Sequence, residues 1–400
     1  MKKNYFMIGL MAMGLTLSVS SCGDDDDTVT PVNNNENVDE ENVVGFGANF
    51  KYHTSKSGYS SAEACVEQIL DGCIDIANEV GNSKIGDPYN EYISGNTTKA
   101  LYSVESWYSW HSRDDYKNNI VSIASSLINV RIDDELDAYD LNTIVEKQSN
   151  TNASIMSKCM KNNSLKAQAE KVWNNVIAAW SAIDAIPQPF RNNIASAESK
   201  AAIEACDALN KELSTLKGQI KSLSENDCQE IVNNFVDAVA LPTYADLVSK
   251  NSALANAVSK LQANPTNDNF EAACEAWLQA RIPWETSEAF LFGPVAELGL
   301  DPNMDSWPLD QEGIENLLNS ENWAAFTWNG EYDENDEAIE AAQALRGYHT
   351  LEYLLFLDGE PRKVTDASYL KYPAAWGNYA KNVALLLKED AATLYDKWTK

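Results

Sequence analysis

Apolar residues recur at three- and four-residue intervals through nearly every long stretch after residue 60, which is the pattern of amphipathic helices. In 61–80, for example, Ala64, Ile69, Cys73 and Ala77 fall on one stripe. Helices of about 15–28 residues joined by short connectors are typical of bundles, so the sequence predicts an all-α fold. We expect no β-hairpin, because we find no Asn-Gly or Asp-Gly pair flanked by alternating strands. The expected helices span 61–80, 165–185, 196–223, 226–240, 244–262, 269–281 and 374–398.

Residue types also indicate where some of these helices begin and end. Ser60 or Ser61 is suited to cap the first helix, and Gly81 is expected to stop it. Pro187 and Pro189 should end the second helix, because proline removes a backbone donor.

The first residues resemble the start of a bacterial lipoprotein. Residues 1–21 have two lysines followed by a short apolar segment, which indicates a signal peptide. The run Val19–Cys22 resembles a lipobox, so Cys22 is expected to carry the acyl chains that hold the protein on a membrane. The alternative is a cleaved secretory signal with a coincidental cysteine.

Residues 22–48 are predicted to form an acidic, disordered tether, because this stretch cannot bury enough apolar area to fold. It opens with four aspartates, Asp24–Asp27. An acidic run after a lipidated cysteine resembles the surface-export signal of lipoproteins in some Gram-negative bacteria. That resemblance implies an anchor in the outer membrane and exposure at the cell surface. A plain solvated linker is the alternative reading.

The chain carries a large excess of negative charge. Asp plus Glu is 60 and Lys plus Arg is 30, for a formal charge of −30. Such a surface repels phosphate backbones and argues against a nucleic-acid partner, while it mildly concentrates cations. Apart from residues 1–17, we see no apolar run long enough to cross a bilayer.

Six cysteines remain besides Cys22, and their spacing does not select a disulfide pattern. Cys65 and Cys73 are about 12 Å apart by helical rise on one expected helix, so they cannot bridge each other. We expect the six to act as small buried apolar residues, with one disulfide allowed by an oxidising compartment. They are Cys65, Cys73, Cys159, Cys206, Cys228 and Cys274.

One histidine of the three in the chain stands in a pattern suited to chemistry. His349 is followed three residues later by Glu352 on an expected helix, so imidazole and carboxylate share one face. Such a pair is half of a transition-metal site or a proton-transfer pair, and a core or capping histidine is the simpler reading. Two ligands are too few for a metal. The candidates for further ligands are Glu288, Glu105 and Asp115.

The surroundings of His349 and several distant blocks resemble the imelysin family. This family contains bacterial envelope proteins grouped with an insulin-cleaving membrane protease and with iron-uptake components. The resemblance implies two helical-bundle domains around a shared cleft, and it covers nearly all of the mature chain. The blocks that carry it are the Gly-x-His-x-x-Glu run of 347–356, Trp277 with Arg281–Trp284, Ser287–Phe290, Asp305–Asp310 and Glu105–Asp115.

The order of these blocks differs from the usual family arrangement, because the Glu105 block precedes the histidine motif. A circular permutation would explain this, with 229–400 resembling the family's first half and 49–228 its second. These two segments are the expected domains. Permutation is tolerated when the native termini lie close together, so we expect Phe50 and Trp398 to be neighbours.

The resemblance also implies cleft-lining residues beyond the histidine motif. Arg281 and Glu288 share a helical face if Pro283 does not break the helix. They could form a buried ion pair, or Arg281 could hold a carboxylate-bearing ligand. Ser106 and Ser109 lie in the Glu105 block, where a chance polar face is the competing reading.

Three functions are compatible with these patterns. The first is a surface-anchored protein that binds a metal ion, iron first among the candidates, or a small ligand in the cleft, in iron acquisition and without catalysis. The second is a metallopeptidase of the imelysin type, although no zinc-protease motif is present. The third is a non-catalytic interaction lipoprotein. We favour the first, and we assign no catalytic residue.

Overall fold

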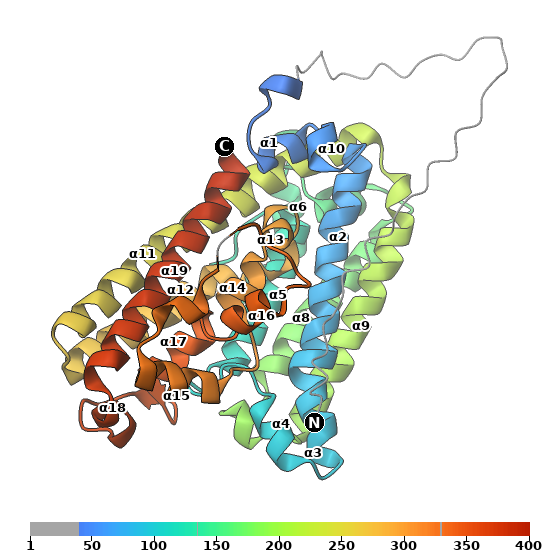
Figure 1. The fold of residues 1–400 in the computed structure, drawn as a ribbon. Helices are drawn as coiled ribbons and strands as arrows, with labels where there is room; N and C mark the ends of the chain where they lie inside the picture. The colour runs from blue at the N-terminus through green and yellow to red at the C-terminus, as the bar shows by residue number, and fades with distance from the viewer. Residues whose placement is uncertain (1–39, 134, 329) are drawn as a thin grey trace. The chain divides into compact units, whose positions relative to one another are not determined.

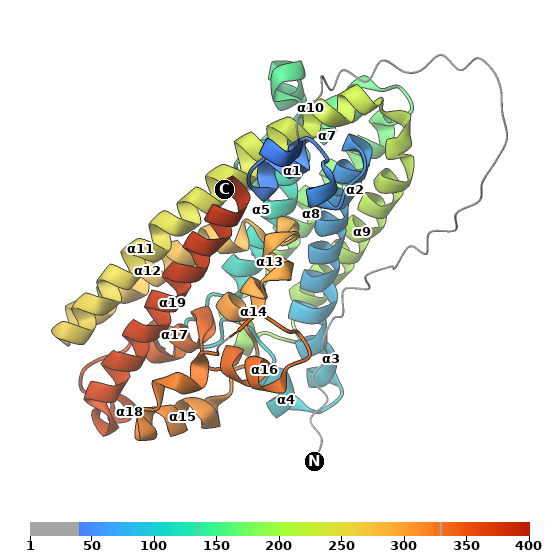
Figure 2. The same cartoon turned by 45° about the horizontal axis from the view of Figure 1, so that its top comes forward.

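Two groups of helices make up most of the molecule (Figures 1 and 2). The structure is a computed structural model that describes residues 40–133, 135–328 and 330–400. The expected signal peptide, Cys22 and most of the tether lie outside the described residues. The described residues pack as one compact unit. The division into 49–228 and 229–400 stays a prediction drawn from the resemblance.

The first bundle is a closed ring of four helices, in which each helix contacts the next and the last contacts the first. Its stripe residues Ile69, Cys73 and Ala77 are buried, as their helical spacing predicts. Ser61 caps its first helix, since its hydroxyl accepts a hydrogen bond from the Ala64 N–H at 3.1 Å. The four helices are α2 (Ala62–Asn78), α5 (Ser112–Ile128), α8 (Lys166–Asp184) and α9 (Ala197–Gln219).

The second bundle has the same ring of contacts among three long helices and one short helix. Large aromatic side chains fill it, and Trp277, Tyr348, Trp376 and Tyr379 are all fully or almost fully buried. The helices are α11 (Leu241–Ala263), α12 (Asn267–Glu285), α17 (Gly347–Leu355) and α19 (Pro373–Thr399). The two bundles meet where α5 contacts α12.

The remaining elements are short and connect or cover the bundles. The α-helices are α1 (Phe46–Lys51), α3 (Asp87–Ile93), α4 (Thr97–Tyr102), α6 (Leu141–Lys147), α7 (Ile155–Lys161), α10 (Glu225–Phe235), α13 (Pro294–Glu297), α14 (Leu300–Asp305), α15 (Gln311–Ser320), α16 (Glu337–Gln343) and α18 (Ala367–Lys371). The 3₁₀ turns are η1 (Glu40–Asn42), η2 (Ser55–Ser57), η4 (Leu136–Ala138), η5 (Asn150–Asn152), η6 (Phe190–Asn192), η7 (Ile220–Ser222), η9 (Glu288–Phe290) and η10 (Trp323–Phe326), and the π-helical segments are η3 (Glu79–Gly86) and η8 (Val236–Ala240).

The all-α prediction is confirmed, and the expected helices are present with ends that differ by a few residues. Two boundaries differ more. Residues 241–243, which lie between two of the expected helices, are helical, because α10, η8 and α11 follow one another without a break. Helix α12 runs past 281 to Glu285 with Pro283 inside it. Arg281 and Glu285 therefore lie one turn apart on the same face.

The prediction that Gly81 stops the first helix is wrong. The chain continues from α2 through the π-helical segment η3 into α3. Gly81 serves close packing instead, because a Cβ there would lie 2.8 Å from the Cβ of Cys206 on α9. The π-helical segment η3 thus approaches α9 closely at Gly81, and Lys84 of the same segment is buried.

The prediction of no β-hairpin is also wrong. Strands β1 (Phe356–Leu357) and β2 (Glu360–Pro361) pair antiparallel around Asp358 and Gly359. Both turn residues have positive φ, 51° and 81°, as a two-residue hairpin turn requires. The strands are too short to show alternation in the sequence. The hairpin contacts the segment 105–115, since the Gly359 N–H donates to the carbonyl of Tyr108 at 2.9 Å.

The start of the described chain lies against its end, as Figures 1 and 2 show for α1 and the C-terminus. The rings of Phe46 and Trp398 are 4.9 Å apart, and Phe50 and Trp398 both contact the ring of Phe292. The expected proximity of Phe50 and Trp398 is therefore confirmed. Such proximity is what a permutation requires, and the permutation itself stays a prediction.

The six described cysteines are all buried and none is bridged, so the disulfide that an oxidising compartment would allow does not form among them. The expectation that they act as small apolar residues is confirmed by their burial. Burial is also the main reason that the thiol pKa rises, to about 12 for Cys159, Cys206 and Cys228.

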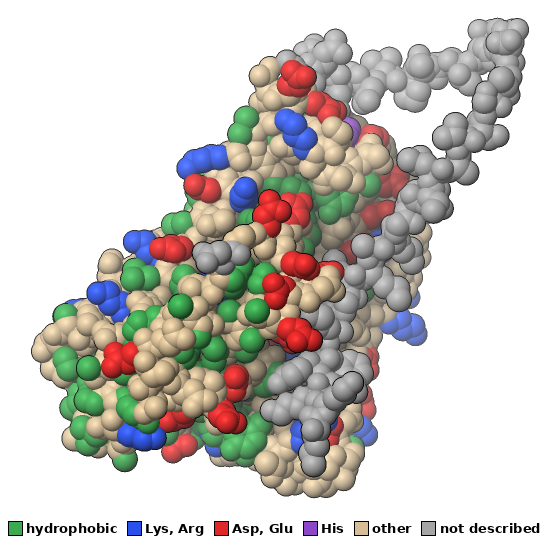
Figure 3. All heavy atoms as spheres, in the orientation of Figure 1, with side chains coloured by type: hydrophobic (Ala, Val, Ile, Leu, Met, Phe, Trp, Pro, Cys, Tyr) green, Lys and Arg blue, Asp and Glu red, His purple; other side chains and the backbone are tan. Residues whose placement is uncertain are grey.

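Within the described part of the chain, no helix has both the length and the apolar character needed to span a membrane. On the face drawn in Figure 3, acidic and basic side chains are interspersed with apolar ones. Other charged side chains, among them Arg281, His349 and Glu352, are fully buried and so differ from these surface charges.

Candidate metal centre

His349 lies in the interior near the meeting point of the two bundles. It is on the first turn of α17 and is fully buried. Gly347 opens this helix with φ of 89°, and a Cβ there would lie 2.6 Å from the Met304 carbonyl oxygen. The close approach brings the end of α14, with Asp305, beside the imidazole. The indole of Trp307 packs against the ring at 4.8 Å between centroids.

Two carboxylates face the Nε2 atom of His349. Asp305 Oδ1 is 3.1 Å from Nε2, and Glu105 Oε1 is 3.3 Å away. Ligand atoms of these three residues all lie within 4.8 Å of one another. They come from three segments far apart in the sequence: the loop before α5, the end of α14 and the start of α17. We call Glu105, Asp305 and His349 the Nε2 cluster.

Glu352 contacts the opposite nitrogen of the ring. Its Oε2 is 3.0 Å from His349 Nδ1, as the three-residue spacing predicts. Its Oε1 accepts hydrogen bonds from the backbone N–H groups of Tyr108 and Ser109 at 3.0 and 2.7 Å, and from the Ser109 hydroxyl at 2.7 Å. Glu352 therefore orients the imidazole and lies behind the ring, whereas the sequence suggested that it is a metal ligand. Ser109 lies here as part of the support for Glu352.

Arg281 is the central cation of the site and is fully buried. Its Nη2 is 3.1 Å from Asp115 Oδ2 and 3.5 Å from Glu105 Oε1. It also forms ion pairs with Asp305 and Glu285. Its partners differ from the expected Glu288, because helix α12 continues through Pro283 and brings Glu285 beneath the guanidinium.

Glu288 pairs instead with Lys84, which the π-helical segment η3 directs inward. Lys84 Nζ lies 4.0 Å from Glu288, 3.2 Å from Glu105 and 3.7 Å from Glu79. Sequence reasoning missed Lys84, because it follows the glycine that was expected to end the helix. The π-helical turns are the local feature that makes this lysine interior.

The serines of the Glu105 block hold the block itself. The Ser106 hydroxyl donates to Asp115, and the Ser112 hydroxyl donates to the Glu105 carbonyl at 2.5 Å. Ser106 has a positive φ of 49°. The structure thus brings Glu105, Ser106, Ser109 and Asp115 together. The two serines donate hydrogen bonds to carboxylates, Ser106 to Asp115 and Ser109 to Glu352.

The predicted site residues do not line an open cleft. Arg281, Ser106, Asp115, His349 and Glu352 are 0% exposed. The side chains of Glu105 and Glu288 are exposed by 8% and 7%. The expectation of a cleft is therefore corrected to a closed polar interior, which forms because both bundles pack against the charged side chains from opposite sides.

Asp305 and Glu285 are the two carboxylates that sequence reasoning left out of the site. Asp305 was recognised only as part of an aromatic turn, in the block Asp305–Asp310. Its position as the first residue of that block was the available signal. Glu285 lies four residues after Arg281, a spacing that indicates an ion pair once the helix is known to continue through Pro283.

The protonation of the cluster follows from burial opposed by neighbouring charge. Burial alone would lower the pKa of His349, but Asp305, Glu105 and Glu352 raise it well above its usual value. Burial would raise the pKa of Glu105, yet Lys84 and His349 lower it to about 2. Arg281 and His349 similarly outweigh burial and lower the pKa of Asp305.

Negative charge exceeds positive charge in this interior. Three cations, Arg281, Lys84 and His349, face six buried carboxylates, namely Glu105, Asp115, Glu285, Glu288, Asp305 and Glu352, and Lys84 also pairs with the more exposed Glu79. Buried carboxylates without counter-charge are costly and take up protons or cations. Burial indeed raises the pKa of Glu285 and Glu288 well above its usual value.

The donor set of the Nε2 cluster fits a transition-metal ion. One imidazole nitrogen with two carboxylate oxygens suits iron, zinc or manganese. The imidazole is oriented by a carboxylate on its other nitrogen, which is the usual arrangement behind a metal-binding histidine. Glu352 provides that support here.

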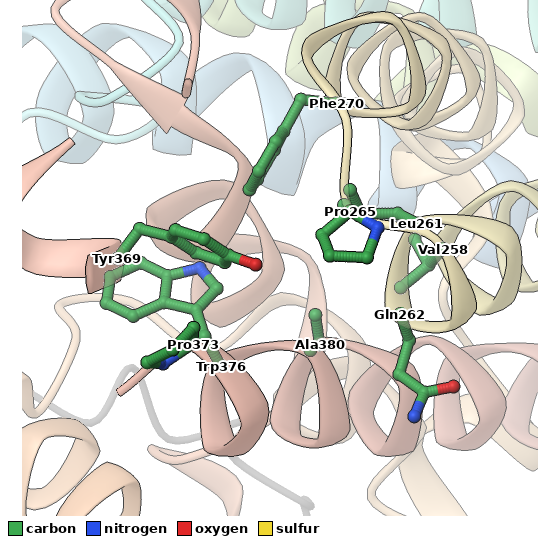
Figure 4. A pocket seen from close by; sticks show the side chains of 10 residues that line it. Val258, Leu261, Gln262, Pro265, Phe270, Tyr369, Pro373, Trp376 and Ala380 are labelled. Carbon is green, nitrogen blue, oxygen red and sulfur yellow. The ribbon is translucent and has the colours of Figure 1, made fainter. Parts of the chain in front are cut away.

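A separate small pocket lies in the second bundle and shares no residue with the Nε2 cluster (Figure 4). Pro265, Phe270, Tyr369 and Trp376 are among the side chains that line it. Its volume of about 10 Å³ has room for about one water molecule, so it does not offer a ligand site comparable with the cluster.

Comparison with known proteins gives a consistent relationship. The family model for imelysin (peptidase M75) matches residues 35–216 and 240–400. The crystal structure of an imelysin peptidase from Bacteroides ovatus superposes with a TM-score of 0.72 at 49% sequence identity, over 80% of this chain and 86% of that one. Iron-regulated protein A from Synechococcus elongatus is 34% identical over 145 residues, which span 36% of this chain and 35% of that protein. By the family match over most of its length, this chain belongs to the imelysin family.

Proposed function

We propose that this protein binds a transition-metal ion, iron first among the candidates, through His349, Glu105 and Asp305. The observation that carries the proposal is that ligand atoms from these three residues lie within 4.8 Å of one another in a closed interior. The name of the Synechococcus relative, an iron-regulated protein, favours iron over the other metals that suit this donor set.

Each neighbouring residue has a role in such binding. Glu352 holds the imidazole so that Nε2 faces the two carboxylates. Arg281 pairs with Asp305, and Lys84 pairs with Glu105, so that both carboxylates are held in position. Because the neighbouring carboxylates raise the pKa of the imidazole well above its usual value, a metal ion must displace a proton from the ring to bind.

Binding would also join the two halves of the molecule. Glu105 comes from the segment that leads into the first bundle, while Asp305 and His349 belong to the half that contains the second bundle. A metal that binds only this assembled arrangement stabilises the folded state by mass action. We propose that the protein acts on the cell surface, held by Cys22 on the outer membrane, and captures metal for iron acquisition without catalysis.

Calorimetric titration of metal-stripped protein with Fe²⁺, Zn²⁺ and Mn²⁺ tests the proposal. We expect binding of one ion, weakened at least about tenfold by His349→Ala, Asp305→Asn or Glu105→Gln. Asp246→Asn is the matched control, since Asp246 pairs with Arg131 at the surface. Unchanged affinity in a variant that carries all three substitutions would contradict the proposal.

A second assay separates binding from catalysis, which the peptidase described from Bacteroides ovatus makes worth testing. The purified protein is incubated with an unfolded protein substrate, with and without a chelator. We expect no cleavage that depends on His349. Cleavage that is lost both with chelator and in His349→Ala would assign a peptidase instead.

A further inference from the structure

Arg191 forms a stacked group with aromatic residues next to the Glu105 block. Its guanidinium carbon lies 3.5 Å from the ring centroid of Trp107 and 6.0 Å from that of Trp110. The ring of Tyr102 stacks on Trp107 at 5.8 Å with an interplanar angle of 25°. We call Tyr102, Trp107, Trp110 and Arg191 the Arg191 stack.

Only one edge of the Arg191 guanidinium is used. Nη1 donates to the carbonyl oxygen of Trp107 at 3.2 Å. The buried Nε has no hydrogen-bond partner among the described residues, and no described carboxylate lies within the 4.0 Å limit of an ion pair with this side chain. Asp358 is close enough to favour the charged form, although burial lowers the pKa of Arg191 overall.

Other arginines of the chain are satisfied differently. Arg131 pairs with Asp246 at 3.0 Å, and Arg346 pairs with Asp390, although the buried Nε atoms of Arg346 and Arg281 also lack a hydrogen-bond partner in the described chain. Arg191 differs in having no ion pair, and no acceptor among the described residues contacts its buried Nε or its Nη2. The indole Nε1 atoms of Trp107 and Trp110 are likewise buried without a partner in the described chain. Three donors in one group thus lack acceptors, which is uncommon for buried polar atoms.

The free edge fits one kind of chemistry. The Nε and Nη2 atoms of arginine form a planar fork that matches the two oxygens of a carboxylate. The face of the guanidinium is already occupied by Trp107, so the fork is fixed in direction. A chain with a formal charge of −30 does not attract anions as a whole. A carboxylate can therefore bind only through a local group of donors such as this one.

The surface beside the stack has room for a small molecule. An open hollow of about 600 Å³ is lined by Tyr102 and by residues from Gly95 to Lys99. Tyr102 is 50% exposed, so its ring belongs both to this hollow and to the Arg191 stack. A ligand with a flat apolar part can contact Tyr102 there, and Trp107 connects this tyrosine to Arg191.

We propose that the Arg191 stack binds the carboxylate of a small organic acid. The carboxylate accepts hydrogen bonds from Nε and Nη2 of Arg191, after a small shift of the side chains that cover Nε. This site is separate from the Nε2 cluster, because none of its four residues contributes a ligand atom there. It does not depend on metal binding.

Calorimetric titration with benzoate tests this site, and benzamide is the neutral probe of the same shape. Metal-stripped full-length protein is used, so that binding through a metal cannot contribute. We expect one benzoate to bind at millimolar or lower concentration and benzamide to bind at least about tenfold more weakly. Arg191→Gln should weaken benzoate binding by a similar factor, while Arg131→Gln should leave it unchanged.

Several results would overturn the assignment. They are no heat with benzoate at millimolar concentration, equal binding of benzamide, or an equal loss in Arg131→Gln, which would indicate a general charge effect. Arg191→Lys provides a second variant if Arg191→Gln is unfolded by circular dichroism. It keeps the charge and lacks the fork, so benzoate binding equal to that of the natural protein would also reject the proposal.

Discussion

The Nδ1 atom of His349 lies 3.0 Å from the Oε2 of Glu352, one helical turn further along α17. The other oxygen of this carboxylate receives the N–H groups of Tyr108 and Ser109. The pair therefore links the histidine helix to the segment that carries Glu105. Orientation of the imidazole and attachment of this segment depend on the same carboxylate.

Glu352→Gln should weaken metal binding by about 10–100-fold, because the imidazole loses the carboxylate that orients it and makes it more basic. Calorimetric titration of the metal-stripped variant measures the change. Glu315→Gln is the matched control, since Glu315 accepts a hydrogen bond from Tyr353 on the same helix, α17. An affinity within twofold of the natural protein would show that Glu352 does not support a metal ligand.

Metal affinity should rise with pH. The neighbouring carboxylates hold a proton on His349 above the usual pKa of the imidazole, and a metal must displace it. Below that raised pKa, the displacement of one proton gives about a tenfold gain in affinity for each pH unit. Titrations between about pH 6 and 8 measure this slope, which should become shallower in His349→Ala.

The stability of the metal-free protein should change in the opposite direction. Because the folded-state pKa of His349 is raised, its contribution is fully present below the unfolded value of about 6.5 and is lost as pH rises through the folded value. Denaturant unfolding at several pH values, compared with His349→Ala, isolates this contribution. A difference between the two proteins that grows as pH increases would contradict the assignment.

Arg281→Gln should lower the free energy of unfolding of the metal-free protein by about 3–5 kcal/mol, because it leaves buried carboxylates without their counter-charge. The partners are Asp115, Glu105, Asp305 and Glu285. Denaturant unfolding measures the loss. Arg131→Gln removes a surface ion pair and should cost at most about 1 kcal/mol. Equal small losses for both variants would argue against a central role for Arg281.

Gly347→Ala should destabilise the protein by about 1–3 kcal/mol or more, because a Cβ at φ of 89° is strained and would lie 2.6 Å from the Met304 carbonyl oxygen. It should also weaken metal binding, since the contact sets Asp305 beside His349. Gly218→Ala is the matched control. No atom lies within 4 Å of its added Cβ, and the change should stabilise helix α9 by about 0.5–1 kcal/mol.

The six described cysteines should not react with a thiol reagent in the folded protein. All are buried, and burial raises the thiol pKa, so the reactive thiolate is scarce. Spectroscopic counting of thiols before and after denaturation measures this, with all six appearing only in the unfolded state. Fast reaction of one or more in the folded protein would show that the interior opens near that cysteine.

The periodicity of apolar residues determined most of the helices without help from the tertiary structure. Helix α8 and the cap of α2 by Ser61 follow from local rules of spacing and hydrogen bonding. The same holds for the contact between His349 and Glu352, since a three-residue spacing on a helix fixes their relative position.

Predictions from the sequence were wrong where the local structure depended on contacts between distant segments. Gly81 has the local character of a helix stop, but it packs closely against Cys206, and the chain continues as a π-helix through the buried Lys84. Pro283 has the local character of a helix breaker, yet α12 continues and places Glu285 beside Arg281.

The amino-acid sequence by itself determined that this chain forms helical bundles and contains an oriented imidazole. Only the tertiary structure decided which carboxylates meet that imidazole, and that they meet it in a closed interior. The physical reason is that helical spacing acts over one or two turns. The approach of Glu105 and Asp305 to His349, by contrast, is set by packing between segments about 40 to 240 residues apart.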